Sequence, residues 1–254
     1  MAFIPLHDSN PWRHIRRPWV AWGIIAANIL IYFAVAVSGE PAQASAISFG
    51  LIPAAFNGIA ERPLELAAVP DLLTLVTYAF LHADLMHLLG NMIFLWVFAD
   101  NVEDALGHVR YFIFYLLCAA AAGYAFVLSD PTSHAPVIGA SGAVGGNIAA
   151  YLLLHPRAKV WILLLLRIPL RLSAVYVLGF WVLFQFFAAA GSDGSDEVAW
   201  WAHIGGLVAG AVLVVFMRRR GVPLFDRVPV TTAPQSAAPA ERRKPDSTGG
   251  PWGL

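Results

Sequence analysis

Charged residues are scarce in this chain of 254 residues: only 13% are Asp, Glu, Lys or Arg, whereas a soluble domain carries about 25%. Cysteine is nearly absent, and the single Cys118 excludes an internal disulfide and a zinc site built from several thiolates. Because Cys118 lies in an apolar run, we expect it to be a packed core residue. The formal net charge of zero argues against a nucleic-acid-binding protein. With 59% hydrophobic residues, the chain is predicted to be a polytopic membrane protein rather than a disordered or soluble one.

The chain contains several long apolar segments. A spanning helix needs about 20 mostly apolar residues, and the candidate segments are 19–37, 81–99, 108–128, 141–154, 174–190 and 199–217. The fourth is too short to cross from residue 141, so the loop before it, residues 129–140, must descend into the protein. Arg167 and Pro169 interrupt the apolar stretch 161–166, which we interpret as leading into the fifth helix. The predicted fold is an all-α membrane protein, a bundle of six transmembrane helices.

Basic residues are distributed unevenly around these spans. Six spans put both termini on one side, and that side collects 15 of the 16 Lys and Arg residues, leaving Arg62 alone in the opposite loops. The positive-inside rule therefore predicts cytoplasmic termini, and the basic inner face favours a bacterial plasma membrane. We divide the chain into an N-terminal cytoplasmic segment (1–18), a membrane domain (19–217) and a cytoplasmic tail (218–254) predicted to be disordered. The long outer loop after the first helix, residues 38–80, has short apolar pieces that we expect at the membrane interface.

Polar residues within spans are costly in a bilayer and are candidates for function. They form clusters at the starts of the second, fourth and sixth helices, which contain His82, His87, Asn91, Gly139, Ser141, Gly142 and His203. The helical rise places Ser141 about 21 Å, His203 about 22 Å and His87 about 20 Å above the cytoplasmic boundary. A serine and two histidines from different helices are therefore predicted to share one depth.

A serine and a histidine at one depth are the minimum for nucleophilic acyl transfer. In that chemistry His203 takes the proton of the Ser141 hydroxyl and later gives it to the leaving amine. No acidic residue shares this depth, and Asp84, the nearest candidate, lies above it near the loop. The sequence therefore predicts a Ser–His dyad rather than a triad.

Glycines flank both members of this pair. Gly142 and Gly146 lie four residues apart on the fourth helix, and Gly206 and Gly210 have the same spacing on the sixth. Small residues at this spacing let two helix backbones approach closely, and alone they are common packing motifs in membranes. Beside a serine and a histidine at equal depth, they predict that the two helices bring the pair within reach.

An acyl-transfer site also needs donors directed at the developing oxyanion. His87 and Asn91 are four residues apart and share a helix face, and the backbone N–H of Ser141 at a helix N-terminus is a further donor. His82 lies five residues before His87, a helical rotation of about 140°, so we do not expect them to share a face. This spacing and the lack of an HExxH motif argue against a zinc site. We expect His82 to support the loop, and we expect no metal or organic cofactor.

The ordered motifs HxxxxHxxxN at 82–91, GxSG at 139–142 and AHxxG at 202–206 resemble those of the rhomboid intramembrane serine proteases. The resemblance covers roughly residues 15–217 and implies that Ser141 is the nucleophile and His203 the base. It implies that His87, Asn91 and the Ser141 amide stabilise the oxyanion, and that Gly139 shapes the loop before the serine. The implied partners are the lipid bilayer and single-pass membrane proteins, whose spanning helix is cut near its outer end. Unwinding of that helix is needed before it can be cut.

Some residues match or depart from the family pattern outside the catalytic motifs. Glu103 and Arg110 match positions that tie the cytoplasmic turn together. Members of the family place an aromatic residue four positions after the nucleophile, under the catalytic histidine, but here that position is Gly145. Either another aromatic, Trp200 or Trp201, orients the histidine, or its ring is held less firmly.

Two alternative functions are kept beside the protease. A catalytically silent rhomboid-like protein would bind or escort membrane-protein clients, but it usually lacks a catalytic residue. A transporter or channel with a polar half-helix site would have repeat symmetry between its halves, which the sequence does not show. The sequence does not determine the oligomeric state or the physiological substrate.

Overall fold

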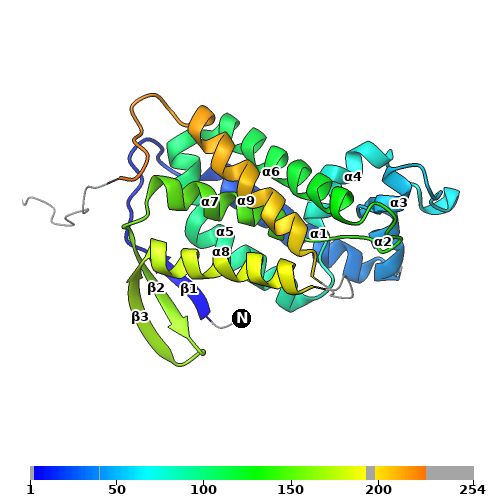
Figure 1. The fold of residues 1–254 in the computed structure, drawn as a ribbon, viewed down its shortest axis with the longest axis horizontal. Coiled ribbons are helices and arrows are strands. Elements are labelled where there is room, and N and C mark those ends of the chain that lie inside the picture. Colours follow the sequence, from blue (N-terminus) through cyan, green and yellow to red (C-terminus); the bar gives the residue numbers. More distant parts are fainter. Residues whose placement is uncertain (1–2, 40, 193–197, 227–254) are drawn as a thin grey trace, which may run out of the picture.

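The structure, a computed structural model, describes residues 3–39, 41–192 and 198–226. Its long helices lie side by side in one bundle (Figure 1), and each of them is long and apolar enough to cross a membrane: α1 (Trp19–Val37), α5 (Leu85–Leu106), α6 (His108–Ser129), α8 (Ala174–Gly191) and α9 (Trp200–Met217). The shorter apolar helix α7 (Ser141–Leu154) packs among α5, α6 and α9. The predicted helical membrane bundle is confirmed.

The second span is the one whose predicted bounds were wrong. Helix α5 begins at Leu85 rather than at residue 81, because the Asp84 carboxylate caps it by accepting the backbone N–H groups of Met86 (2.7 Å) and His87 (2.9 Å). It ends at Leu106 rather than at residue 99, because the polar side chains of its last turns are buried and hydrogen-bonded. The bounds of the other spans agree with the prediction to within one residue.

The outer loop forms the short elements α2 (Ala42–Phe49), α3 (Pro53–Phe56), η1 (Leu64–Leu66), α4 (Asp71–Thr77) and η2 (Tyr78–Phe80), at one end of the bundle (Figure 1). Arg62, the lone basic residue on this side, is a structural group with a side chain only 6% exposed. It forms an ion pair with Asp71 at 2.7 Å and donates to the backbone carbonyls of Ser48 and Val69. The interfacial position of this loop stays a prediction.

A small sheet at the opposite end corrects the interpretation of residues 161–166. They do not lead into a helix but lie largely in β2 (Lys159–Leu164), which pairs antiparallel with β3 (Ile168–Ser173) and with the N-terminal strand β1 (Phe3–Asp8). Val160 and Ile162 are buried while Trp161 between them is exposed, so the residues alternate with the period of a strand. We call this end of the bundle the basic end, because it carries Arg13, Lys159 and Arg219.

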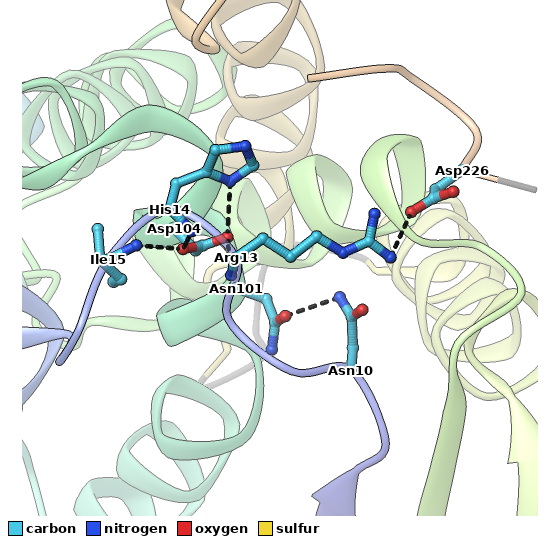
Figure 2. Close-up of polar contacts among 7 residues, drawn as sticks. All are labelled: Asn10, Arg13, His14, Ile15, Asn101, Asp104 and Asp226. Atoms are coloured by element: carbon cyan, nitrogen blue, oxygen red, sulfur yellow. Dashed lines mark hydrogen bonds and ion pairs between the residues drawn. The ribbon is translucent and has the colours of Figure 1, made fainter. Parts of the chain in front are cut away.

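Figure 2 shows how the N-terminal segment is held at the basic end. One Asp104 oxygen accepts the backbone N–H groups of His14 (2.6 Å) and Ile15 (2.7 Å), and the other accepts that of Arg13 (3.0 Å). The Arg13 guanidinium forms an ion pair with Asp226 at 3.3 Å. The segment is therefore fixed to the end of α5 by a buried carboxylate.

Part of the predicted tail is also ordered at this end. The backbone N–H of Arg219 donates to Ala105 of α5 at 2.9 Å, and that of Phe225 donates to Leu153 of α7 at 2.6 Å. Residues 218–226 therefore pack on the membrane domain, which the sequence did not predict, because these contacts join segments far apart in the chain. Residues 227–254, for which disorder is predicted, lie outside the described residues.

Glu103 links the first two spans. Its carboxylate has no exposed surface and accepts the backbone N–H groups of Val20 (3.1 Å) and Ala21 (2.7 Å) at the start of α1. A carboxylate at a helix N-terminus satisfies unpaired donors and interacts favourably with the helix dipole. Arg110, the other predicted tie, donates to the Met217 carbonyl at the end of α9 (3.4 Å).

Candidate active site

The segment before Ser141 is non-helical and is held inside the protein. Leu51 and Val137 exchange two backbone hydrogen bonds (3.1 and 2.8 Å), and the Gly139 N–H donates to the Tyr78 carbonyl (3.0 Å). Gly139 has a φ of +126°, a conformation that favours glycine, and a Cβ there would lie 2.6 Å from His87. The predicted descent into the protein is confirmed for the end of this loop, residues 137–140, and it lets α7 begin at Ser141 within the bundle.

Ser141 and His203 are in direct contact. The Ser141 hydroxyl lies 2.8 Å from Nε2 of His203, which is in the first turns of α9 and only 8% exposed. The glycines beside the pair explain the contact. A Cβ on Gly206 would overlap the Gly142 carbonyl, and a Cβ on Gly210 would overlap Gly146. The predicted close approach of these two helices is confirmed.

Gln185 of α8 contacts the other ring nitrogen of His203, and the sequence reasoning missed it. The Gln185 side-chain oxygen lies 2.8 Å from Nδ1 of His203, and the glutamine is only 2% exposed. The available signal was a lone polar residue inside the apolar span 174–190. The expected pair therefore has a third neighbour, which is a neutral amide and not a carboxylate.

Asp84, the acidic residue considered as a third member, has a different position. Its carboxylate caps α5, and the hydrogen bond from the His87 backbone N–H is the main cause that holds the pKa of Asp84 below its usual value. It therefore carries its charge at the N-terminus of α5, where the helix dipole favours a negative group.

Two tryptophans flank the His203 ring. The Trp200 ring lies edge-on at a centroid distance of 5.8 Å, and the Trp181 ring of α8 lies tilted at 6.2 Å. A Cβ on Gly145 would lie 3.1 Å from the His203 carbonyl oxygen, so the backbone of α9 occupies the space that an aromatic side chain would need. Trp200, one of the two expected aromatics, is in contact, whereas Trp201 is 48% exposed.

The remaining polar candidates surround the loop that precedes Ser141. His87 lies against Gly139, and the Asn91 amide nitrogen is 3.1 Å from Nε2 of His82. The rings of His82 and His87 are 5.2 Å apart, so the expectation that they face apart is wrong. It assumed a helix through His82, which lies before the Asp84 cap. Among the described residues, no group of three or more His, Cys, Asp or Glu side chains is placed to hold a metal ion.

This arrangement has the parts of a nucleophilic site. A serine hydroxyl is hydrogen-bonded to an imidazole, and the serine lies at a helix N-terminus whose cap position, Ala140, provides no side-chain acceptor. The first backbone N–H groups of α7 are therefore not satisfied by a side-chain cap and point toward the same end of the helix as the serine.

Comparison with known proteins identifies a family for this chain. The family model of the rhomboid domain matches residues 70–220, which is more than half of the chain. The mitochondrial RHOMBOID-like protein 12 of Arabidopsis thaliana is 27% identical over 163 residues, which are 58% of this chain and 46% of that protein. The Rhomboid protease GluP of Bacillus subtilis is 26% identical over 195 residues, 76% of this chain and 34% of that protein.

A longer match is to the Rhomboid-like protease 3 of Toxoplasma gondii, which is 25% identical over 223 residues, 82% of this chain and 74% of that protein. The chain spans less than half the length of the first two relatives. The family model, the helical bundle and the order of the motifs agree, and the chain belongs to the rhomboid family of membrane proteins.

Proposed function

We propose that the chain is an intramembrane serine endopeptidase that cleaves transmembrane-helix substrates within or near the outer part of the bilayer. The observation that carries the proposal is the 2.8 Å contact between the Ser141 hydroxyl and Nε2 of His203, partly buried between α7 and α9. A polar pair at such a position is costly unless it has a function. Two relatives are named as proteases, which supports the same reaction.

The reaction follows from the protons that each group can move. His203 accepts the hydroxyl proton at Nε2 while the Ser141 oxygen attacks the substrate carbonyl carbon, and a tetrahedral intermediate forms. The same imidazole then donates this proton to the leaving amine, so the peptide bond breaks and an acyl-serine remains. A water molecule, deprotonated by His203, attacks the acyl-serine and releases the second product.

The negative charge of the tetrahedral intermediate is proposed to lie at the N-terminus of α7. The Ser141 backbone N–H and the helix dipole both favour an anion there. His87, placed by its contact with Gly139, and Asn91 are the proposed side-chain donors. The Asn91 amide nitrogen contacts His82 through one hydrogen and retains a second, so His82 orients the donor rather than taking part in the reaction.

The proposed substrate is an extended segment of a single-pass membrane protein. A protease site binds an extended peptide, so a substrate helix must unwind near the cut, and helix-weakening residues favour this. Ser141 lies at the end of α7 away from the basic end, and the 14 residues of that helix correspond to about 21 Å of helical rise. Cleavage is therefore proposed on the far side of the membrane from the sheet β1–β3.

A fluorophosphonate probe together with a transmembrane substrate in lipid vesicles tests the proposal. Wild-type protein is expected to be labelled and to cleave the substrate, whereas Ser141→Ala and His203→Ala lose both. Ser129→Ala is the matched control, because this serine is exposed at the end of α6 and should leave labelling unchanged. A folded wild type that neither labels nor cleaves any transmembrane substrate contradicts the proposal and favours the silent, client-binding alternative.

We also propose that both termini are cytoplasmic and that the membrane is a bacterial plasma membrane. The support is the concentration of basic residues at the end that carries the ordered N-terminal segment and residues 218–226. Cys118 is fully buried, so a cysteine introduced at Arg16 or Glu65 can be labelled selectively in sealed cells. The label is expected at position 65 from outside and at position 16 only after permeabilisation; the reverse pattern contradicts this orientation.

A further inference from the structure

We propose that Gln185 is a positioning residue that fixes the proton of His203 on Nδ1, so that Nε2 remains the base for Ser141. The inference rests on the proposed function and assigns a role to a residue outside the family motifs. It starts from three contacts in a row: Ser141 Oγ to His203 Nε2 (2.8 Å), His203 Nδ1 to Gln185 Oε1 (2.8 Å), and Gln185 Nε2 to the Trp181 carbonyl (3.1 Å).

The last contact determines the orientation of the Gln185 amide. The Trp181 carbonyl can only accept, so the amide must present its NH2 group to it. The amide oxygen then faces His203, and an oxygen can only accept, so Nδ1 must carry the ring proton. In the neutral ring Nε2 is then an acceptor for the Ser141 hydroxyl. The reversed amide would place two oxygens together at Trp181, and its NH2 group could contact His203 only if Nδ1 carried no proton.

The neutral amide suits its location. In a Ser–His–Asp triad a carboxylate orients the histidine and stabilises its charged form. Gln185 is 2% exposed on a membrane helix, where an isolated carboxylate would be costly. An amide keeps the orienting function at a lower desolvation cost. Because Trp181 also flanks the His203 ring, α8 supplies two of the contacts that hold the imidazole.

The decisive comparison is between Gln185→Met, which keeps the length but has neither donor nor acceptor, and Gln185→Glu, which keeps an acceptor. In Gln185→Met the kcat and the rate of probe labelling are expected to fall about 10- to 100-fold with little change in KM, as loss of one buried hydrogen bond to the base implies. Gln185→Glu should recover most of the rate. Phe187→Leu, at a position 75% exposed on the same helix, is the control.

A second measurement separates this proposal from the proposed function. Nitrogen-15 NMR of ring-labelled histidine, with the His203 signal assigned by its loss in His203→Ala, reports which ring nitrogen carries the proton. We expect Nδ1–H in the wild type and a shift toward Nε2–H in Gln185→Met. An unchanged tautomer, or a Gln185→Met enzyme with the wild-type rate, overturns the role of Gln185. A wild type with the expected tautomer and no protease activity overturns the proposed function alone. If Gln185→Met does not fold, the wild-type tautomer and the rate of Gln185→Glu decide. An Nε2–H tautomer in the wild type, or a loss of rate in Gln185→Glu as large as in His203→Ala, overturns the role of Gln185.

The β2–β3 hairpin projects from the bundle beside α8 (Figure 1). Residues 165–167 connect the strands, and the two central residues of the turn are Leu165 (φ +50°) and Leu166 (φ +58°), both in the left-handed region that glycine and asparagine favour. These leucines are 66% and 64% exposed, and Ile168 next to them is 49% exposed. Leucines at such positions gain nothing from the backbone conformation or from packing in this chain.

We infer that this hairpin tip inserts into the membrane interface at the basic end. The exposed leucines and Ile168 can contact the acyl chains at the membrane boundary. Arg167 and Arg171 beside them can interact with anionic headgroups. The Arg171 guanidinium lies 6.0 Å from the Trp161 ring centroid, and tryptophan is enriched at membrane interfaces. The occupant of the apolar tip is therefore the bilayer itself.

An environment-sensitive fluorophore on Ile168→Cys tests this in vesicles that contain anionic and brominated lipids. We expect quenching by the brominated chains, and loss of that quenching in the variant Leu165→Asn/Leu166→Gly, whose tip is polar but suits the turn. A fluorophore on Arg220→Cys, an exposed site outside the hairpin, should not be quenched in either background. Unquenched label at 168, quenching that survives the Asn-Gly tip, or self-quenching between copies overturns membrane insertion.

Discussion

If the proposed function holds, replacing Gly206 with alanine is expected to inactivate the protein without changing the side chain of Ser141 or His203. The new methyl group would overlap the Gly142 carbonyl oxygen on α7, which is backbone and cannot rotate away. Carbon contacts in proteins are optimal at about 3.5–4.0 Å, so α7 and α9 have to move apart by roughly 1 Å or more. Gly142 adjoins Ser141, and Gly206 lies one turn after His203, so the separation acts directly on the pair.

The size of the effect follows from the hydrogen bond in the site. Its length is 2.8 Å, and an added 1 Å exceeds the range of a hydrogen bond. A displacement of this size costs about 100-fold in rate, and overpacking costs about 1–3 kcal/mol of stability. We therefore expect kcat to fall about 100-fold in Gly206→Ala, together with a lower melting temperature in detergent.

The matched control is Gly179→Ala on α8, where a Cβ would have no atom within 4 Å. Alanine favours a helix over glycine by about 1 kcal/mol, so this variant should be as active and at least as stable as the wild type. Cleavage rate per folded protein and melting temperature are measured for both. A Gly206→Ala protein with wild-type rate refutes the reasoning, and a loss of stability alone shows that the glycine contact holds the helices but not the pair.

Four further changes test other parts of the structure. Burial raises the pKa of Asp8 to about 7 from 3.8, so the folded state binds this proton more tightly than the unfolded state and loses stability as pH rises from about 4 through about 7. Asp8→Asn should remove this loss, which is on the order of 4 kcal/mol at most. If the unfolding free energies of Asp8→Asn and wild type change in parallel from about pH 5 to 8, the prediction is contradicted. Gly139→Ala, at a positive φ and against His87, should lower kcat without losing the helical circular dichroism, whereas an unchanged kcat argues against a fixed loop. Glu103→Gln weakens the contacts at the start of α1 and should lower the melting temperature, since hydrogen bonds to charged groups contribute about 1.5–3 kcal/mol each, and an unchanged value argues against this cap. Arg62→Met leaves the carbonyls of the outer loop without their donor, so limited proteolysis should cut residues 57–70 faster than in the wild type.

Long apolar runs and the rare polar residues within them were predictable from the sequence. The bounds of α1 and α7 agree with the prediction. A bilayer imposes length and composition on the spanning helix α1, and the shorter α7 begins where non-helical backbone is buried in the protein. Ser141 and His203 were identifiable for the same reason, since polar residues stand out where charge is scarce. The glycine spacing predicted which helices meet. The close approach is confirmed, because a Cβ on Gly206 would overlap the Gly142 carbonyl.

Other features depend on contacts that no local pattern encodes. The start of α5 depends on the Asp84 cap, and the proximity of His82 to His87 depends on the loop before that cap. The strand β1 and residues 218–226 are ordered by segments distant in the sequence. These contacts join segments that only the packed bundle brings together.

The sequence by itself determined the membrane fold, the asymmetry of basic residues and the identities of the paired Ser141 and His203, because hydrophobicity and residue chemistry are local properties. Only the tertiary structure placed Gln185 against Nδ1 of His203 and the backbone of α9 against Gly145. The orientation of a side chain depends on neighbours from other helices, and here α8 supplies the acceptor for a histidine of α9. Which ring nitrogen can act as a base is therefore a property of the packed bundle.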